Sequence, residues 1–250
     1  MSGHVSIWWV YAGTVALFLL ASEGGFRVGR RLRKPAAEDG SGTVLGGLLA
    51  LLGLLLAFTF GMASARYDGR KQMLLDEANA IGTAYLRADL LPEPVKGEVR
   101  TLFRAYVDLR LEVARSGKVQ EAIGPSERIH GELWSRAVRH AEASPTPVAA
   151  LVVQAVNDVI DMHGKRVALG WRNPIPPAIL YTLYLVAVLA LGVMGLEGGL
   201  RGFRSAAPTL AVVITLATVV ALIVDLDRPG EGLLQVSQQA MAELRASMGP

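Results

Sequence analysis

Residues 44–63 read VLGGLLALLGLLLAFTFGMA and contain no Asp, Glu, Lys or Arg. An α-helix needs about 20 such residues to cross a hydrocarbon core of roughly 30 Å. A helix also satisfies its own backbone hydrogen bonds, which lipid cannot do for it. This stretch is therefore predicted to be a membrane-spanning helix, and the rest of the chain is interpreted outward from it.

Three further runs, residues 7–22, 178–196 and 206–224, also lack charged side chains, and the shortest of them comes first. The four runs stand two and two around a middle segment of ordinary polarity. Residues 1–6 carry no basic stretch ahead of the first run, so a retained helix is expected there rather than a signal peptide.

The predicted fold is all-α, with four transmembrane helices in two hairpins flanking a helical extramembrane bundle. The domain expectation follows the composition shifts: a first hairpin over 1–63, an extramembrane domain over 64–177, a second hairpin over 178–224, and a tail over 225–250 with room for a short amphipathic helix.

Composition narrows the possible functions. The formal net charge is +3, and the basic residues cluster beside the apolar runs. Membrane lipid is therefore the expected partner, and nucleic acid is not. The chain has no cysteine, which excludes disulfides, thiolate metal sites and a cysteine nucleophile.

The orientation in the membrane is nearly balanced by charge. Short loops with many Lys and Arg residues tend to stay inside. The first and last loops are basic, but so are the segments that flank the spans on the opposite side. Charge alone slightly favours an outside position for the middle domain, and both orientations remain open.

One pattern occurs twice, after the first and third runs. Residues 23–30 and 197–204 both match E-G-G-x-R-x-x-R. Two spans separate the copies, so both are expected at the same membrane face. The glycines are expected to end each helix in the left-handed conformation, and the arginines to meet helix carbonyls or lipid phosphate. Internal duplication and a merely shared interfacial role are both open.

The second span carries two separate stripes of residues. Small residues recur at helical spacing and would let another helix approach closely: Gly46, Ala50, Gly53, Ala57 and Gly61. Bulky residues form the other stripe: Leu51, Leu55, Phe58 and Met62. The bulky stripe is a candidate hydrophobic constriction of a pore, and packing against lipid or a neighbouring helix is the alternative.

No proline occurs from Thr43 to Leu91, so this helix is expected to continue beyond the membrane. The continuation carries a polar stripe, which either lines a wet vestibule or is a solvated face: Asp76, Asn79, Thr83 and Arg87. Arg66, Arg70 and Lys71 precede it and would concentrate anions at a pore mouth.

The middle domain is expected to be a bundle of helices. After Pro92 and Pro94, an apolar seam follows the spacing of one buried helix face: Val95, Val99, Leu102, Tyr106, Leu109 and Val113. A loop is expected up to Gly124-Pro125, with Ser126 capping the next helix. Thr146 is expected to cap the helix that starts at Pro147.

No catalytic arrangement stands out in this domain. None of the four histidines has the spacing of a helical zinc motif, and no phosphate-binding loop or nucleophile elbow occurs. Asp158, Asp161 and His163 lie close in sequence, and solvated surface charge is the preferred interpretation over a cation site. We therefore expect no enzyme activity and no cofactor.

The fourth run ends in Asp225, Asp227 and Arg228. Carboxylates are unfavourable at a helix C-terminus, so partners are expected for them. A salt-bridge network, with Arg66 or Arg228 as the cation, and a cation-binding or gating site are the two alternatives. Whether a metal binds there stays open.

Three stretches resemble the bestrophin-like membrane proteins of bacteria, a family grouped under a domain of unknown function. They are residues 54–92, 173–195 and 224–239; the segments 76–83 and 225–229 are the most specific. The resemblance extends over nearly the whole chain and implies a multi-pass protein of the bacterial plasma (inner) membrane.

The resemblance also implies a function. Bestrophins are pentameric anion channels whose second helix lines the pore through an apolar neck and whose acidic cluster binds calcium. Leu55, Phe58 and Met62 are the comparable neck candidates, and Asp225 with Asp227 the comparable acids, although this chain has no run of consecutive acids. We therefore expect a homo-oligomeric channel for inorganic ions, with anions preferred. A non-conducting scaffold or sensor, whose helical domain binds a partner, is the main alternative, and a small transporter is the third.

Overall fold

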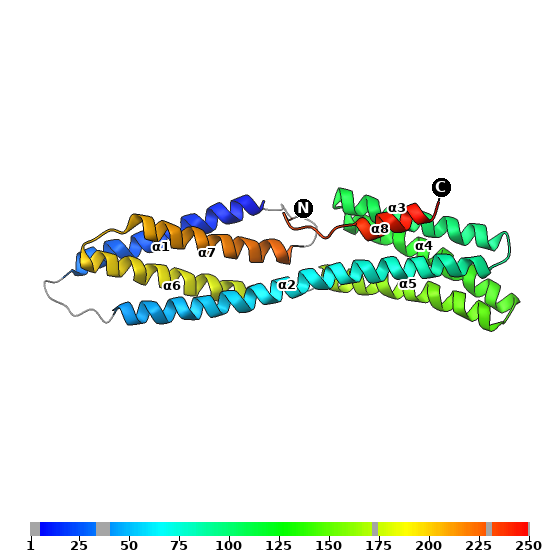
Figure 1. The fold of residues 1–250 in the computed structure, drawn as a ribbon, viewed down its shortest axis with the longest axis horizontal. Helices are drawn as coiled ribbons and strands as arrows, with labels where there is room; N and C mark the ends of the chain where they lie inside the picture. Colours follow the sequence, from blue (N-terminus) through cyan, green and yellow to red (C-terminus); the bar gives the residue numbers. More distant parts are fainter. Residues whose placement is uncertain (1–5, 34–40, 172–174, 229–231, 250) are drawn as a thin grey trace. The chain divides into compact units, whose positions relative to one another are not determined.

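The computed structural model describes residues 6–33, 41–171, 175–228 and 232–249, and every regular element within these ranges is helical (Figure 1). The elements in chain order are α1 (Ile7–Leu32), α2 (Ser41–Arg87), the 3-10 helix η1 (Ala88–Leu90), α3 (Val95–Ser116), α4 (Val119–Ala143), α5 (Pro147–Trp171), α6 (Pro177–Arg201), α7 (Ala206–Asp227) and α8 (Gln239–Ser247).

Four helices are long and apolar enough to cross a membrane. They are α1, α2, α6 and α7, so the all-α fold with four candidate spans is confirmed. Helix α2 is 47 residues long, more than twice what a hydrocarbon core requires. Its length follows from the proline-free sequence. It ends at Arg87, and one turn of 3-10 helix, η1, follows it before Pro92, as expected.

The chain divides into two compact units, which are described separately. The first contains Met1–Arg66, Pro174–Arg228 and Gly232–Leu234, and so holds the four apolar helices. The second contains Tyr67–Asn173, Pro229–Glu231 and Gln235–Pro250.

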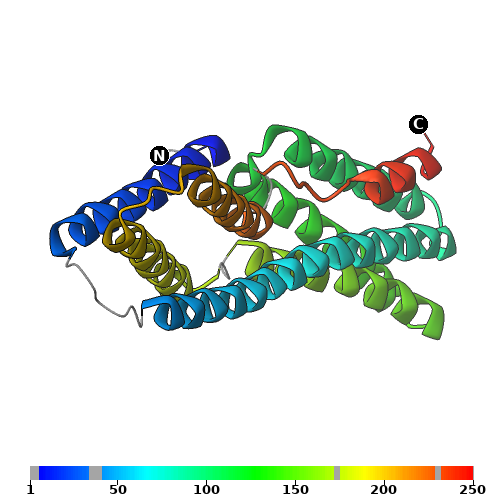
Figure 2. The ribbon, with the colours of Figure 1, turned by 60° about the vertical axis from the view of Figure 1, so that its left-hand side comes forward.

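In the first unit, α1 packs against both α6 and α7 (Figures 1 and 2). Helices α1 and α6 run parallel, because Gly25 meets Gly192 and Gly29 meets Leu196 further along both helices. Earlier along this contact, the Thr14 hydroxyl lies 2.7 Å from the Tyr184 hydroxyl, and Phe18 is completely buried beside the Tyr184 ring. The packing places both E-G-G-x-R-x-x-R copies at the same end of the helix pair, as the sequence predicts.

The expected role of the glycines in these copies was wrong. Gly24, Gly25, Gly198 and Gly199 do not end helices in the left-handed conformation; they lie inside α1 and α6. A Cβ atom at Gly25 or Gly199 would collide with a backbone carbonyl oxygen of the other helix. The glycines are needed for close approach of two backbones, and Gly202, at φ +69°, is the residue that ends α6.

The second unit is a helical bundle around one apolar core. The core joins the C-terminal part of α2 to α3, α4, α5 and α8, and its completely buried members include Ile81, Phe103 and Leu133. Helix α8 lies along α3 (Figure 2). Its end is fixed by the Tyr85 hydroxyl, which donates to the Met248 carbonyl at 2.8 Å in a buried position.

Two details of this bundle differ from the sequence expectation. Helix α4 begins at Val119 and continues through Pro125, so the expected loop and the Ser126 cap are wrong. Pro125 lies in the second turn of α4, where a proline removes the hydrogen bond to the carbonyl of residue 121, and this cost is why the sequence predicted a break there. The α5 cap is confirmed, because the Ala149 N–H donates to the Thr146 hydroxyl at 3.1 Å.

The expected buried seam of α3 is confirmed only in part, because Val99, Tyr106 and Val113 are buried but other members are not. Leu102 and Leu109 are only half-buried, whereas Phe103, Val107 and Arg110 are buried. The buried face is therefore rotated toward an arginine, and the reason is a charged partner described below.

Candidate functional site

The bulky stripe of α2 lies on a face that the first unit leaves largely uncovered. Phe58 is 65% exposed and Leu51 is 45% exposed, while Leu55 and Met62 are half-buried. Each of the next residues along the chain, about 100° further around the helix, is buried: Leu52, Leu56, Thr59 and Ala63. Within this unit, α2 thus has one packed face and one apolar face that the other described parts of the unit cover only in part.

The small-residue stripe of α2 is uncovered as well. A Cβ atom added at Gly46, Gly53 or Gly61 would meet nothing within 4 Å. Among the described residues, therefore, no helix of this chain uses the close approach that these glycines permit.

The polar stripe of α2, which belongs to the second unit, is also largely exposed. Asp76, Asn79 and Thr83 are exposed and Arg87 is half-buried. Local partners hold two of them, since the Gln72 amide donates to Asp76 at 2.9 Å and the Arg87 guanidinium donates to the Leu151 carbonyl at 3.0 Å. The remaining acceptors and donors of the stripe are available to solvent.

The predicted mouth residues differ in exposure. Lys71 is exposed, whereas Arg66 and Arg70 are half-buried. The Arg66 guanidinium lies 3.6 Å from the Asp227 carboxylate, so part of its charge is compensated within the first unit. A half-buried arginine that already has an anion nearby attracts a mobile anion less strongly than a free one would.

Asp225 and Asp227 accept hydrogen bonds from the backbone near the ends of the apolar helices. Both Asp227 oxygens accept from the Ile175 N–H, at 3.0 and 3.2 Å, just before α6 begins. Asp225 is buried and accepts from the N–H groups of Leu233 and Leu234, at 2.9 and 3.0 Å. The Arg66 contact is an ion pair with Asp227, whereas the donors named for Asp225 are backbone N–H groups, so the salt-bridge network and the cation site both stay predictions. Arg228 forms the C-cap, and its N–H donates to the Asp225 carbonyl at 3.2 Å.

A charged cluster that the sequence analysis missed lies in the core of the second unit. Glu77 is completely buried. The Arg110 guanidinium donates to both of its oxygens at 3.1 Å, and the Tyr106 hydroxyl donates at 2.8 Å. The Arg166 guanidinium lies 3.3 Å away. We call Glu77, Tyr106, Arg110, His130, His163 and Arg166 the Glu77 cluster.

Two histidines complete the Glu77 cluster. Arg166 donates to His163 Nδ1 at 3.0 Å, which leaves the ring proton on Nε2. The His130 ring lies 4.8 Å from the His163 ring and 4.6 Å from the Tyr106 ring, measured between centroids. The Nε2 atoms of both histidines are buried without a hydrogen-bond partner.

The environment of the cluster holds the histidines neutral. Burial, and next the neighbouring His163, lower the pKa of His130 to about 4. Burial, and next the charge of Arg166, lower the pKa of His163 to about 4. Burial, and next the Glu77 carboxylate, raise the pKa of the Tyr106 hydroxyl well above its usual value. One carboxylate and two guanidinium groups therefore carry the charge of this cluster.

A weak signal for the cluster existed in the sequence. Arg166 falls on the apolar side of its helix with Leu151, Ala155 and Val159, which is unusual for a solvated arginine. Its partner Glu77 follows Leu74 by three residues and precedes Ile81 by four, so helical spacing places it beside the apolar side of α2, whereas Asp76 lies on the other side. Asp158 and Asp161 are exposed, as expected, whereas the nearby His163 faces the core.

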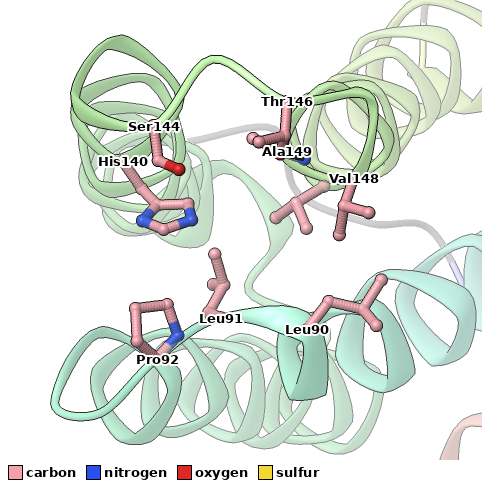
Figure 3. Close-up of a pocket in the computed structure, with 9 residues that line it drawn as sticks. Leu90, Leu91, Pro92, His140, Ser144, Thr146, Val148 and Ala149 are labelled. Carbon is pink, nitrogen blue, oxygen red and sulfur yellow. Dashed lines mark hydrogen bonds between the residues drawn. The ribbon is translucent and has the colours of Figure 1, made fainter.

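Two other features bear on ligand binding. No group of three or more His, Asp or Glu side chains within the described ranges is placed to hold a metal ion. A pocket of about 420 Å³ opens between residues 90–92 and the α4–α5 connection, with His140 and Ser144 facing Leu91 and Pro92 (Figure 3). None of the predicted site residues lines it.

The chain matches a known protein family and is similar in fold to solved structures. A family model described as a bestrophin-like domain matches residues 12–241. No match was found among curated proteins. A tryptophan-to-alanine variant of a bacterial bestrophin homologue from Klebsiella pneumoniae is similar in structure, at 15% identity and a TM-score of 0.74 over 98% of both chains.

Two further structures agree with this likeness. Another structure of the Klebsiella pneumoniae bestrophin homologue matches at 14% identity and a TM-score of 0.68, over 97% of both chains. A leucine-to-alanine variant described only as a membrane protein matches at 12% identity and a TM-score of 0.71, over 95% of both chains. At these identities, the matches establish a shared fold.

Proposed function

Because this chain belongs to the bestrophin-like family, we propose that copies of it assemble in the bacterial plasma membrane into an ion channel, with α2 lining the path and anions preferred. One observation carries the proposal. In the membrane part of α2, the unit that contains them leaves the small-residue stripe uncovered and the bulky stripe largely uncovered, although a third face of the helix is packed.

An assembly explains both uncovered stripes at once. Small residues let helices approach closely in a membrane, so the Gly46–Gly61 stripe is suited to contact with a neighbouring copy. Bulky apolar residues that point into a narrow pore can gate it by dewetting. Leu51, Leu55, Phe58 and Met62 would form that constriction.

The polar residues of the second unit suit an aqueous path beyond the constriction. Asp76, Asn79 and Thr83 are exposed on one side of α2, and exposed Lys71 with half-buried Arg70 lies before them. A basic entrance concentrates anions, which is why anions are preferred in the proposal. The family and these side chains give no support to catalysis.

Ion flux is the direct test of this function. The purified full-length protein is reconstituted in liposomes, and chloride efflux is followed with and without calcium and at several voltages. Efflux well above that of empty vesicles supports the proposal, and efflux equal to theirs under all conditions contradicts it. The mass of the detergent-solubilised particle separates the alternatives, because a ring of copies supports a channel and a monomer or dimer supports a scaffold.

A further inference from the structure

A pocket of about 900 Å³ lies in the first unit, between the C-terminal parts of α1 and α6 and the start of α7. Its walls combine two chemistries. Leu19, Leu20, Met194 and Leu210 make one part apolar, and Leu20 is 70% exposed. The charged part comes from both E-G-G-x-R-x-x-R copies, which the α1–α6 packing brings together.

The charged part of the pocket is formed by Glu23, Arg27, Glu197, Arg201 and Arg204. Glu23 accepts from the Arg27 guanidinium at 2.9 Å and from the Arg204 guanidinium at 2.7 Å. Arg201 lies 3.7 Å from Glu197. Three arginines and two glutamates leave one positive charge in excess.

The arginines keep donors for a further ligand. Their side chains are 60 to 70% exposed, and a guanidinium has five N–H donors in a planar fork. A single carboxylate contact uses at most two of these donors. The remaining ones can bind phosphate oxygens in the bidentate geometry that arginine favours.

We propose that this pocket binds one anionic phospholipid, with the phosphate held by Arg201, Arg204 and Arg27 and an acyl chain against Leu20 and Leu210. The pocket lies where the apolar runs of α1 and α6 end and α7 begins, which is the depth of lipid headgroups. An isolated phosphate would use only the charged part. The adjoining exposed apolar wall identifies a lipid as the occupant.

The inference depends on the membrane location and is independent of ion conduction. It predicts that the intact protein in detergent binds phosphatidylglycerol at least about tenfold more tightly than phosphatidylcholine with the same acyl chains. Native mass spectrometry with each lipid measures this ratio directly. Equal binding of the two lipids would overturn the proposal.

A pair of variants localises the site. Arg201→Gln with Arg204→Gln should weaken phosphatidylglycerol binding about tenfold or more, since the variant removes two of the three positive charges proposed to hold the phosphate. Both side chains are largely exposed, so the fold should tolerate the change. Arg115→Gln is the matched control, because Arg115 is 74% exposed in α3 and has the same kind of helical ion pair, with Glu112. Unchanged lipid binding in the double variant would contradict the proposal.

A final comparison separates lipid from free phosphate. Phosphatidylglycerol should raise the melting temperature of the wild-type protein, and the double variant should lose this increase. Inorganic phosphate at the same concentration and ionic strength should give no such increase. An equal effect of inorganic phosphate would show that the pocket binds anions without the acyl chain.

Discussion

Glycines of the α1–α6 contact and glycines of α2 occur in similar apolar helices but have opposite surroundings. A Cβ atom at Gly25, Gly195 or Gly199 would collide with backbone atoms of the facing helix. A Cβ atom at Gly46, Gly53 or Gly61 would meet nothing within 4 Å. The first set lets two helices of the chain pack closely, whereas the second is left uncovered by the described residues.

The part of α2 that belongs to the second unit also has one buried side and one exposed side. Glu77 and Asp76 are neighbouring acids, yet Glu77 is buried among two arginines and a tyrosine while Asp76 is exposed. The helix therefore has a closed side, which is buried in the core of the second unit, and an open side, which is exposed. The open side is the one to which we assign function.

The largest expected loss of stability comes from a substitution on the closed side of α2. Glu77→Ala leaves Arg110 buried without its carboxylate, which typically costs about 3–5 kcal/mol of stability. Thermal unfolding of the full-length protein in detergent should show a large fall in melting temperature or loss of folded material. Asp76→Ala is the matched control and should change the melting temperature little. A similar fall in both variants would refute the distinction between the two sides.

A smaller loss is expected at the α1–α6 contact. Gly195→Ala places a methyl group against the carbonyl oxygen of Ser22, and overpacking of this kind costs about 1–3 kcal/mol. Gly53→Ala should be neutral or slightly stabilising, because alanine has the higher helix propensity. Melting temperatures of the two variants in one detergent give the comparison. Equal stability of the Gly195 variant and the wild type would mean that the contact is looser than described.

The closed side should also respond to pH. His130 and His163 have pKa values lowered to about 4 in the folded protein, whereas unfolded histidine titrates near pH 6.5. Between these values the unfolded chain binds more protons, so the free energy of unfolding should fall as the pH drops from about 6.5 to 4, by roughly 2–3 kcal/mol for each histidine.

The His163→Asn variant isolates this contribution. An asparagine oxygen can still accept the hydrogen bond from Arg166, but the side chain does not titrate. Its melting temperature should fall less steeply with acidification than that of the wild type. Identical pH profiles would show that other groups cause the acid sensitivity.

The smallest of these effects concerns assembly. Gly53→Ile fills the open small-residue stripe without touching the packed face of α2. We expect the protomer to keep its secondary structure, while association weakens by about tenfold, or about 1.4 kcal/mol. Light scattering over a range of detergent-to-protein ratios measures this change, and Gly13→Ile on α1, where a Cβ also has free space, is the control. An unchanged particle mass would remove the stripe from the subunit contact.

Long apolar runs were sufficient to predict the four spans, because a charge-free helix of that length is far more stable in lipid than in water. The face of α3 was harder to predict. Its buried side includes Arg110, which is stable there only because Glu77, 33 residues earlier in the chain, lies opposite it. Local periodicity cannot identify such a distant charge partner.

The E-G-G-x-R-x-x-R copies are a second case in which a residue's role depends on contacts with a distant part of the chain. Their shared membrane face could be predicted by counting spans, but the role of their glycines could not, since it depends on which helix packs against which. Asp225 is a third case. Its partners are the N–H groups of Leu233 and Leu234, and an irregular segment gives no sequence signal for where its backbone will turn.

Cysteine accessibility on the open face of α2 tests the central claim most directly, because the natural chain contains no cysteine. Phe58→Cys and Phe60→Cys are reconstituted separately, and chloride flux is measured before and after a charged, membrane-impermeant thiol reagent. The two positions are two residues apart and therefore lie on different faces of the helix. The account predicts that the reagent blocks flux at position 58 and leaves flux at position 60 unchanged. Equal sensitivity at both positions, or block at position 60 alone, would contradict it.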